Sequence, residues 1–355
     1  MPSQKLQVGC AGLGRMGRRH AMNFLTRTPR ASLVAAFSPD EKELEWAREH
    51  LAPYGVTLYK DYDAMLKHEG LQAVVIATAT VVHKEQTIKA INADKHVLCE
   101  KPLALSVEES QAVLDAARAK PHLKVMCGFS RRFDASYRDA WEKVKKGAVG
   151  RPTIIRSQTC DKYDPSGFFL SYASGCGGIF VDTSIHDIDL ALWFLGGDSK
   201  IRSISAVGVT AIEPKLRKLG DRDNAVGMVE FYDGKIAYFF ACRMNAAGQE
   251  DSTEIVGTKG KVTVNIYPQS NLVNIYDSTG IRREIPQTYY DRFRHAFVKE
   301  AEEFTAACLD NTDVPLRLEE AVYAVRIATA LQEALISEKK IYFDQDGKRV
   351  EFAKL

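Results

Sequence analysis

A glycine-rich stretch near the start of the chain constrains the fold more than any other feature. An apolar run at residues 6–12 leads into a G-x-G-x-x-G pattern at residues 12–17, and an amphipathic stretch follows it. In a strand-to-helix turn, the first glycine permits the tight turn, the second lets a phosphate approach the backbone, and the third lets the helix pack on the strand. The pattern therefore predicts a dinucleotide site whose phosphate-binding residues are Gly12, Gly14, Arg15, Met16 and Gly17.

The first third of the chain alternates short apolar runs with helical patterns. The apolar runs lie at residues 6–12, 32–37, 71–78, 95–100 and 123–129. The helical patterns between them lie at residues 40–50, 82–93 and 106–119. Nearly continuous apolar strands separated by helices are typical of a parallel sheet covered on both faces. Residues 1–128 are therefore predicted to form a doubly wound α/β domain of the Rossmann type.

The pattern changes after one more helical stretch at residues 134–146. Long strands follow each other with tight turns such as Asp233-Gly234, and they lie at residues 152–159, 201–210, 225–232, 235–242, 253–256, 261–266 and 271–276. Two helices are predicted at residues 291–310 and 317–337. Strands joined by short turns indicate a mostly antiparallel sheet. The predicted fold class is therefore α/β plus α+β, with residues 129–355 forming the substrate-binding and oligomerisation domain on a large open sheet.

Composition excludes several classes of function. The 355 residues carry a formal net charge of only +2, which does not favour a nucleic-acid or membrane partner. No apolar run approaches the ~20 residues that span a bilayer, and the first residues enter a strand directly, which leaves no room for a signal peptide. The seven cysteines show no C-x-x-C spacing, so we expect reduced thiols in a cytoplasmic protein, with neither disulfides nor zinc.

Two polar clusters carry the predicted chemistry. Glu100-Lys101-Pro102 ends the apolar run at 95–100, at the edge of a parallel sheet where ligands bind. Asp182 and His186 stand four apart in a predicted amphipathic helix, so they share a face. A carboxylate beside an imidazole suits a general base, and a lysine ammonium favours a developing alkoxide.

Structural roles for the same residues are also open. Lys101 can form a surface ion pair, and Asp182 can cap the helix or pair with His186. A metal site would combine Asp182, His186, Asp187 and Asp189, but no second histidine or cysteine at ligand spacing supports it. We therefore predict no metal.

The residue after the second predicted strand bears on the choice of cofactor. An Asp or Glu at this place binds the 2′-hydroxyl of the NAD ribose and repels the 2′-phosphate of NADP. This chain has Ser38 there, which favours NADP, whereas Asp40 shortly afterwards argues against a phosphate. The predicted cofactor is NAD(P), with the two forms unresolved.

Several motifs together resemble one family. The motifs that carry the resemblance are GLGRMG (12–17), IATATVVH (76–83), LCEKPLALS (98–106), GFSRRFDASY (128–137) and GGIFVDTSIHDID (177–189). The chain resembles the glucose–fructose oxidoreductase / inositol dehydrogenase (Gfo/Idh/MocA) family, and is most similar to its inositol dehydrogenases. The resemblance covers nearly the whole chain. It implies that Lys101 orients the substrate, that His186 is the catalytic base, and that Asp182 supports His186.

The resemblance also implies roles for other positions. It implies a cofactor site that includes Ser38, Thr78, Thr80, His83, Glu100, Lys101 and Arg131. For Arg131, a salt bridge with Asp134 is an equal alternative. Asp161 and Tyr163 lie in a loop that can bind further substrate hydroxyls. The chain departs from the family pattern at Ser38, and at residues 243–251, which lack the tyrosines of some inositol dehydrogenases.

The sequence thus predicts an NAD(P)-dependent dehydrogenase that moves a hydride between the nicotinamide and a ring carbon of a polyol or sugar, with inositol-like substrates leading. We expect a homodimer or homotetramer formed through the C-terminal sheet, because a large apolar face of a sheet is rarely left bare. Two alternatives are a regulator of the same fold that binds the cofactor without turnover, and a redox-assisted glycosidase.

Overall fold

The computed structural model describes residues 5–351, and its backbone contacts divide the chain into two compact units. The first unit runs to Phe133 and also includes His295–Val325, whereas the second comprises Asp134–Arg294 and the chain from Arg326 onward. The predicted domain division after residue 128 stays a prediction. No helix in the described part of the chain has the length and apolar character needed to cross a membrane.

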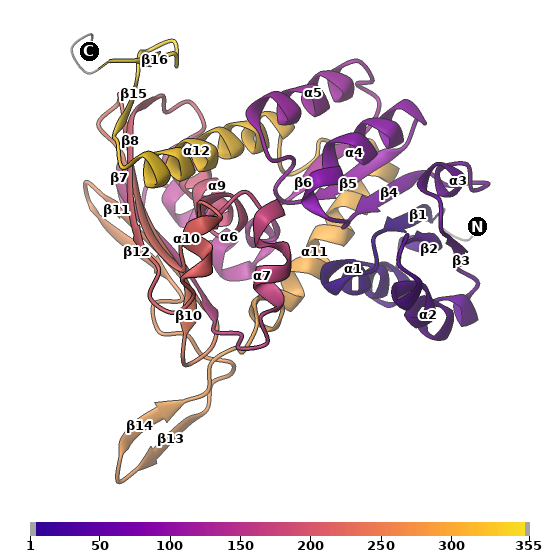
Figure 1. The fold of residues 1–355 in the computed structure, drawn as a ribbon, viewed down its shortest axis with the longest axis horizontal. Coiled ribbons are helices and arrows are strands. Elements are labelled where there is room, and N and C mark those ends of the chain that lie inside the picture. Colours follow the sequence, from indigo (N-terminus) through magenta and orange to yellow (C-terminus); the bar gives the residue numbers. More distant parts are fainter. Residues whose placement is uncertain (1–4, 352–355) are drawn as a thin grey trace. The chain divides into compact units, whose positions relative to one another are not determined.

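The first unit is built on a six-stranded parallel sheet with the strand order β3-β2-β1-β4-β5-β6 (Figure 1). This is the order of a dinucleotide-binding Rossmann sheet, so the predicted fold is confirmed for this unit. The strands are β1 (Leu6–Ala11), β2 (Ala31–Phe37), β3 (Thr57–Tyr59), β4 (Ala73–Ile76), β5 (His96–Glu100) and β6 (Val125–Gly128). The three-residue strand β3 was not predicted, because it is too short to show an apolar run.

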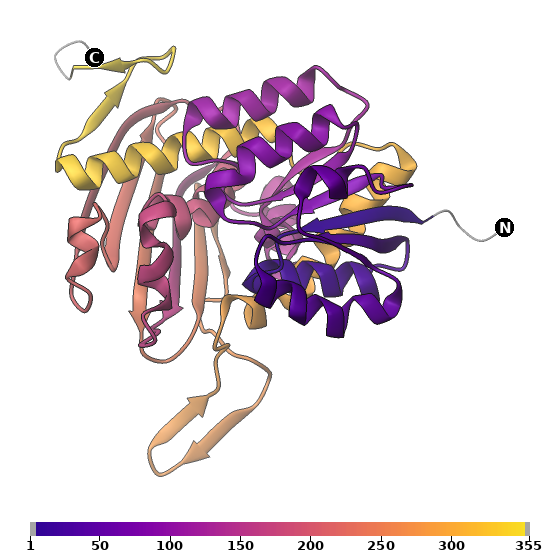
Figure 2. The same cartoon turned by 45° about the vertical axis from the view of Figure 1, so that its right-hand side comes forward.

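Helices cover both faces of this sheet, as Figures 1 and 2 show for α1 on one face and for α4 and α5 on the other. The helices are α1 (Arg15–Thr26), α2 (Glu41–His50), α3 (Tyr62–Leu66), α4 (His83–Asn92) and α5 (Val107–Arg118), with the short turns η1 (Ala52–Tyr54), η2 (Thr80–Val82) and η3 (Ser130–Phe133). Because both faces are covered, β4 is buried along its whole length, which explains its continuous apolar sequence.

The second unit is built on an eight-stranded sheet with the order β12-β11-β7-β10-β9-β8-β15-β16. Its strands are β7 (Pro152–Lys162), β8 (Ile201–Val209), β9 (Asn224–Phe231), β10 (Ile236–Asn245), β11 (Glu250–Gly257), β12 (Gly260–Val264), β15 (Ile341–Phe343) and β16 (Arg349–Val350). The sheet is mostly antiparallel, as predicted, but β7 and β10 are parallel neighbours. The chain between them crosses over through helices and the β8–β9 pair, which brings β10 back beside β7 in the same direction.

Helices pack on one face of this sheet. The helices and short turns of this unit are α6 (Ala135–Lys145), α7 (Phe168–Tyr172), η4 (Ala173–Gly175), α8 (Ile179–Asp182), α9 (Ile185–Leu195) and α10 (Lys215–Lys218), and α6, α8 and α9 contact its strands. The unit also includes the start of α11 (Tyr289–Asp310) and the end of α12 (Leu318–Ser337). The contact is close at Gly227 of β9, where a Cβ would lie 2.7 Å from Phe180 and 2.8 Å from Leu331. Glycine therefore lets the helices approach the strand.

Two local predictions were wrong. The segment that holds Asp182 and His186 is not a single amphipathic helix, because α8 ends at Asp182 and α9 starts at Ile185. Ten of the eleven residues of α9 are buried, since the helix packs against β7 and is covered on its other sides as well. The predicted strand at 271–276 is β13 (Asn274–Asp277), which pairs only with β14 (Gly280–Arg283) in a small exposed hairpin outside the large sheet.

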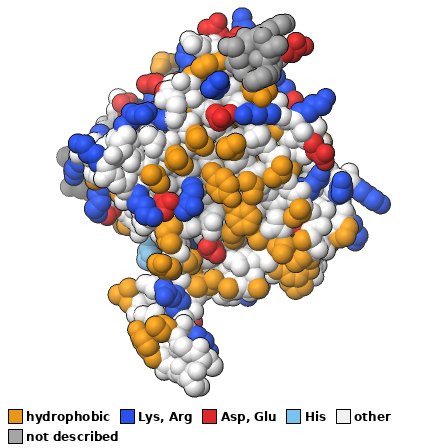
Figure 3. Space-filling model, turned by 90° about the vertical axis from the view of Figure 1, so that its left-hand side faces the viewer, with side chains coloured by type: hydrophobic (Ala, Val, Ile, Leu, Met, Phe, Trp, Pro, Cys, Tyr) orange, Lys and Arg blue, Asp and Glu red, His pale blue; other side chains and the backbone are white. Residues whose placement is uncertain are grey.

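The other face of the large sheet carries exposed apolar side chains, which Figure 3 shows as a broad patch. We call this surface the outer face. Its exposed side chains include Ile154, Val207, Val209, Met228 and Tyr238, from four neighbouring strands. Tyr238 of β10 lies directly opposite Met228 of β9, so the apolar residues are contiguous across strands.

Candidate active site

The glycine-rich turn lies between β1 and α1 and is shaped by steric limits. Gly12 has a φ of +88°, which side chains rarely allow, and a Cβ there would lie 2.6 Å from the carbonyl oxygen of Ala77. A Cβ on Gly17 would collide with the carbonyl oxygen of Gly12. Only glycine fits at these two positions, as the motif predicts.

The turn fits the pyrophosphate of a dinucleotide. Gly14 is the residue before α1, and no side chain among the described residues caps the backbone N–H groups at the start of this helix. A Cβ on Gly14 would meet just one group, Oε1 of Glu43 at 3.2 Å, so the space in front of the helix is open. Arg15, the first residue of α1, is exposed beside it. Backbone N–H groups and a cation at a helix N-terminus suit phosphate oxygens.

Ser38 and Glu43 meet beside this turn. The Ser38 hydroxyl donates a 2.6 Å hydrogen bond to Oε2 of Glu43, and the same oxygen accepts the backbone N–H of Leu13 at 3.0 Å. Ser38 also accepts the backbone N–H of Asp40 at 3.1 Å. Ser38 and Asp40 were predicted to bear on the choice of cofactor, but Glu43 was not, because it reaches back from the first turn of α2.

His83 ties the loop after β4 to the turn after β5. Its Nδ1 lies 2.9 Å from the carbonyl oxygen of Pro102, and its Nε2 lies 3.1 Å from that of Thr78. Burial alone would lower the pKa of His83, but the Cys99 sulfur and the two carbonyl groups outweigh burial and raise the pKa to about 9. Carbonyl oxygens only accept hydrogen bonds, so both ring nitrogens carry protons.

The Glu100-Lys101-Pro102 turn is held in place by hydrogen bonds of the Glu100 carboxylate. Oε1 of Glu100 lies 2.7 Å from Nε2 of the buried His20, and its Oε2 accepts the backbone N–H of Lys101 at 3.1 Å. Burial raises the pKa of Glu100, but His20 and Lys101 together hold it below its ordinary value. Glu100 therefore fixes the backbone from which the half-buried Lys101 side chain projects. The peptide bond between Lys101 and Pro102 is cis.

The remaining predicted cofactor residues of the first unit lie in short turns. Thr78 donates its hydroxyl to Oε1 of Gln86 at 2.7 Å, and Thr80 begins η2. Arg131 is fully buried in η3. Asp134, the alternative partner for Arg131, pairs with Arg292 at 2.8 Å within the second unit. The cofactor roles of these residues stay predictions.

In the second unit, His186 lies in the first turn of α9 and is 4% exposed. The hydroxyl oxygen of Tyr289 lies 3.1 Å from its Nε2, and the two rings stack with centroids 5.1 Å apart. A phenol can donate to or accept from an imidazole, so Tyr289 can exchange a proton with His186 or orient it. No local sequence signal pointed to Tyr289, which lies 103 residues away along the chain.

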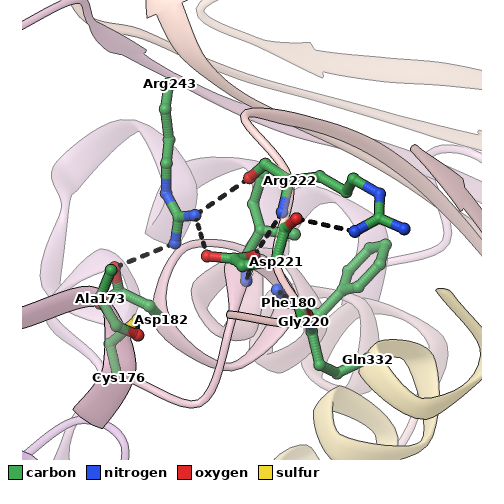
Figure 4. A network of polar contacts seen from close by, with 10 residues as sticks. Ala173, Cys176, Phe180, Asp182, Gly220, Asp221, Arg222, Arg243 and Gln332 are labelled. Carbon is green, nitrogen blue, oxygen red and sulfur yellow. Dashed lines mark hydrogen bonds and ion pairs between the residues drawn. The ribbon is translucent and has the colours of Figure 1, made fainter. Parts of the chain in front are cut away.

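Asp182 belongs to a network of buried charges (Figure 4). Arg243 of β10 pairs with Oδ2 of Asp221 at 2.5 Å and with Oδ2 of Asp182 at 3.4 Å, and its guanidinium lies 4.0 Å from the ring centre of Phe169. Asp221 in turn accepts the backbone N–H of Ile179, the first residue of α8, at 2.8 Å. The network thus holds both ends of the helix that carries Asp182.

The neighbouring acids of α9 have structural partners. Asp187 is fully buried and accepts hydrogen bonds of 2.6 Å from the hydroxyls of Ser157 and Thr159 on β7. These bonds tie α9 to the sheet. Across residues 5–351, no group of three or more His, Cys, Asp or Glu side chains is arranged to hold a metal ion.

Of the two predicted substrate residues, Asp161 lies inside β7 and not in a loop as predicted, because the strand continues to Lys162, whereas Tyr163 follows the strand. Asp161 accepts a hydrogen bond of 2.8 Å from Nε2 of Gln249, and the side chain of Tyr163 is exposed. Their contact with a substrate stays a prediction. Arg243 was missed as a partner of Asp182, although a charged residue directly after the apolar run of β10 was a usable signal.

Comparisons with known proteins identify the family of this chain. The profile of an oxidoreductase family with an NAD-binding Rossmann fold matches residues 6–129, and that of the GFO/IDH/MocA C-terminal domain matches residues 137–263. The chain is 34% identical over 315 residues to scyllo-inositol 2-dehydrogenase (NAD(+)) of Bacillus subtilis, covering 87% of this chain and 88% of that protein.

Solved structures are similar over nearly the whole chain. The scyllo-inositol dehydrogenase of Lactobacillus casei, solved with NAD(H) and scyllo-inositol bound, superposes with a TM-score of 0.90 at 36% identity, covering 96% of this chain and 99% of that one. The myo-inositol 2-dehydrogenase of Lactobacillus plantarum superposes with a TM-score of 0.91 at 32% identity, covering 96% and 100%.

Proposed function

Because the chain belongs to the GFO/IDH/MocA oxidoreductase family, we propose that it is an NAD-dependent dehydrogenase that oxidises a ring hydroxyl of an inositol-like polyol. The observation that carries the proposal is that a chain 36% identical to a scyllo-inositol dehydrogenase carries both Glu100-Lys101-Pro102 and the Asp182/His186 pair. Family membership and the oxidoreductase class were predicted from the motifs, and both are confirmed.

Oxidation of a CH–OH group to a ketone removes a hydride from carbon and a proton from oxygen. The nicotinamide ring, when bound, supplies the hydride acceptor. We assign the proton to His186, whose imidazole is a base suited to neutral pH. The Tyr289 hydroxyl, 3.1 Å from Nε2, then orients the ring or passes the proton onward.

Lys101 and Asp182 have supporting roles in this proposal. The Lys101 ammonium binds the reacting oxygen and favours its alkoxide character as the proton leaves. Asp182 supports His186, and its own position depends on Arg243 and the buried Asp221. Asp161 and Tyr163 are proposed to bind other ring hydroxyls.

The proposal includes association of identical chains. The outer face exposes apolar side chains on four adjacent strands (Figure 3), and large apolar patches usually mark protein interfaces. We propose that this face pairs with the same face of a second copy, which gives a dimer or a tetramer. A cytoplasmic location stays a prediction from the unpatterned cysteines.

The test is reduction of the nicotinamide, followed by absorbance, with NAD and NADP in parallel. The substrates are scyllo- and myo-inositol, glucose, galactose, xylose and glucuronate. We expect turnover with at least one inositol and a loss of about 100-fold or more in kcat for Lys101→Ala and for His186→Gln, since general acid–base catalysis contributes about 10²–10⁴-fold.

The matched controls are Lys84→Ala and His122→Gln, which change the same residue types at exposed positions and should leave turnover intact. Tight cofactor binding without turnover on any polyol would contradict the proposal and favour a regulator. Release of free sugar from a glycoside without net change in the reduced cofactor would favour a glycosidase.

A further inference from the structure

Beside the glycine-rich turn lies a carboxylate that the usual cofactor motif does not include. We propose that Glu43, rather than the residue that follows β2, selects NAD over NADP in this chain. The inference rests on the proposed function, because it assigns the specificity of the same dinucleotide site.

The position of the Glu43 carboxylate supports this proposal. In Rossmann folds, the acid that binds the adenosine ribose follows the second strand and lies beside the glycine-rich turn. Oε2 of Glu43 lies 3.0 Å from the backbone nitrogen of Leu13 within that turn and 2.6 Å from Oγ of Ser38 just after β2. Oε1 faces Gly14, 3.2 Å from the place of a Cβ. Glu43 thus puts a carboxylate where the motif normally puts one.

The hydrogen bonds of the Ser38 hydroxyl also support the proposal. A serine has one hydroxyl proton, and Ser38 donates it to Glu43. Its oxygen already accepts the backbone N–H of Asp40. Ser38 therefore has no further proton to donate to a phosphate oxygen, and the reading of Ser38 as a residue that favours NADP loses its basis.

The charges around the site favour NAD over NADP. A 2′-phosphate would lie against the Glu43 carboxylate, and like charges at contact distance repel strongly. Among the described residues, no lysine or arginine forms an ion pair with Glu43, whereas Lys60 and Arg48 both pair with Glu41. The hydroxyls of the NAD ribose, in contrast, are donors that a carboxylate accepts.

Arg18 is a cation close to Glu43 and has to be considered. Arg18 donates from Nε to the carbonyl oxygen of Leu13 at 2.8 Å, and its guanidinium lies 4.8 Å from the ring centre of Trp46. These contacts direct Arg18 to the loop carbonyl and to the indole of α2. We therefore assign Arg18 to holding α2 against the turn, and not to binding a phosphate.

The position of Glu43 is fixed by the start of its helix. Asp40 caps α2 by accepting the backbone N–H groups of Lys42 at 2.7 Å and of Glu43 at 3.2 Å. An acidic cap of this kind sets where the helix begins. The carboxylate is therefore held in place before a cofactor arrives, which reduces the entropy cost of binding the ribose.

The test measures equilibrium binding of NAD and NADP to the full chain by isothermal titration calorimetry, so it does not depend on turnover. The unchanged chain should bind NAD more tightly than NADP. Glu43→Gln keeps the shape and removes the charge. We expect NAD to bind about 10-fold more weakly and NADP to bind more tightly, since hydrogen bonds to a charged acceptor are stronger than those to a neutral one.

Two further variants make the result interpretable. Glu45→Gln makes the same change at an exposed position of the same helix and should alter neither affinity. Glu43→Asp keeps the charge, so it should weaken NAD binding while still rejecting NADP, which separates charge from helix stability.

The outcomes distinguish this inference from the proposed function. If the unchanged chain binds NAD but Glu43→Gln leaves the ratio of the two affinities unaltered, Glu43 is not the selector and the dehydrogenase proposal stands. Preference of the unchanged chain for NADP would overturn the inference and the NAD dependence in the proposed function, but would leave the dehydrogenase chemistry untouched. Binding of neither cofactor would remove both proposals.

Discussion

At the scale of single residues, His83 shows how a buried titratable group can act as a structural clamp. Its two ring nitrogens face carbonyl oxygens of Thr78 and Pro102, and its pKa is raised to about 9 from an ordinary value of 6.5. Because the folded pKa exceeds the unfolded one, the stabilisation is complete below pH 6.5 and is lost as the pH rises through 9.

We expect the free energy of unfolding of the unchanged chain to fall by about 2–3 kcal/mol more than that of His83→Gln between these pH values, because one pKa unit corresponds to about 1.4 kcal/mol. Urea unfolding at pH 6 to 9.5 measures the difference. His122→Gln, at an exposed histidine, serves as the control. Parallel pH curves for His83→Gln and the unchanged chain would refute the clamp.

At the scale of secondary-structure elements, the short helix α8 depends on charges from elsewhere in its unit. Arg243 and Asp221 are almost completely buried and paired at 2.5 Å, and Asp221 also accepts the first N–H of α8 (Figure 4). Removing one partner leaves the other charge buried and uncompensated, which costs about 3–5 kcal/mol in known cases.

We therefore expect Arg243→Met to lower the free energy of unfolding by about 3–5 kcal/mol and to reduce turnover through the loss of a partner for Asp182. Denaturant titration and steady-state kinetics measure the two effects. Arg349→Met, which removes an exposed pair with Glu333, should change stability by less than about 1 kcal/mol. Equal effects of the two substitutions would show that the buried network is not needed for stability.

The properties of individual helices and strands also explain which predictions from the sequence succeed. The Rossmann half was predicted well because buried parallel strands give continuous apolar runs, as in β4, and because glycines mark the turn at Gly12 and Gly17. The break between α8 and α9 was missed, since Thr183 and Ser184 carry no strong helix-stop signal. Contacts such as Tyr289 with His186, or Glu43 with Leu13, depend on folding over longer distances and leave no local pattern.

At the scale of the whole molecule, association of chains through the outer face is a proposal that can be tested directly. Val207 is 69% exposed on β8 and belongs to the outer face. Burying such a surface against a second copy is favourable, whereas a charge placed inside the interface would lose its hydration.

We expect the unchanged chain to be a dimer or tetramer by size-exclusion chromatography with light scattering, and Val207→Asp to shift it toward the monomer. Tyr54→Asp introduces the same charge at an exposed apolar residue of the first unit and should leave the assembly intact. A monomeric unchanged chain, or an assembly insensitive to Val207→Asp, would place the interface elsewhere or exclude it.

The contact between Glu43 and Ser38 has a consequence for how enzymes of this family are sorted by cofactor. A rule that inspects one alignment column, the residue that follows β2, would find a hydroxyl here and group the chain with phosphate-tolerant enzymes. The folded chain presents a carboxylate 2.6 Å from that hydroxyl, supplied from five residues farther along. Classification would be more reliable if it compared which charge lies at that place, whatever sequence position supplies it.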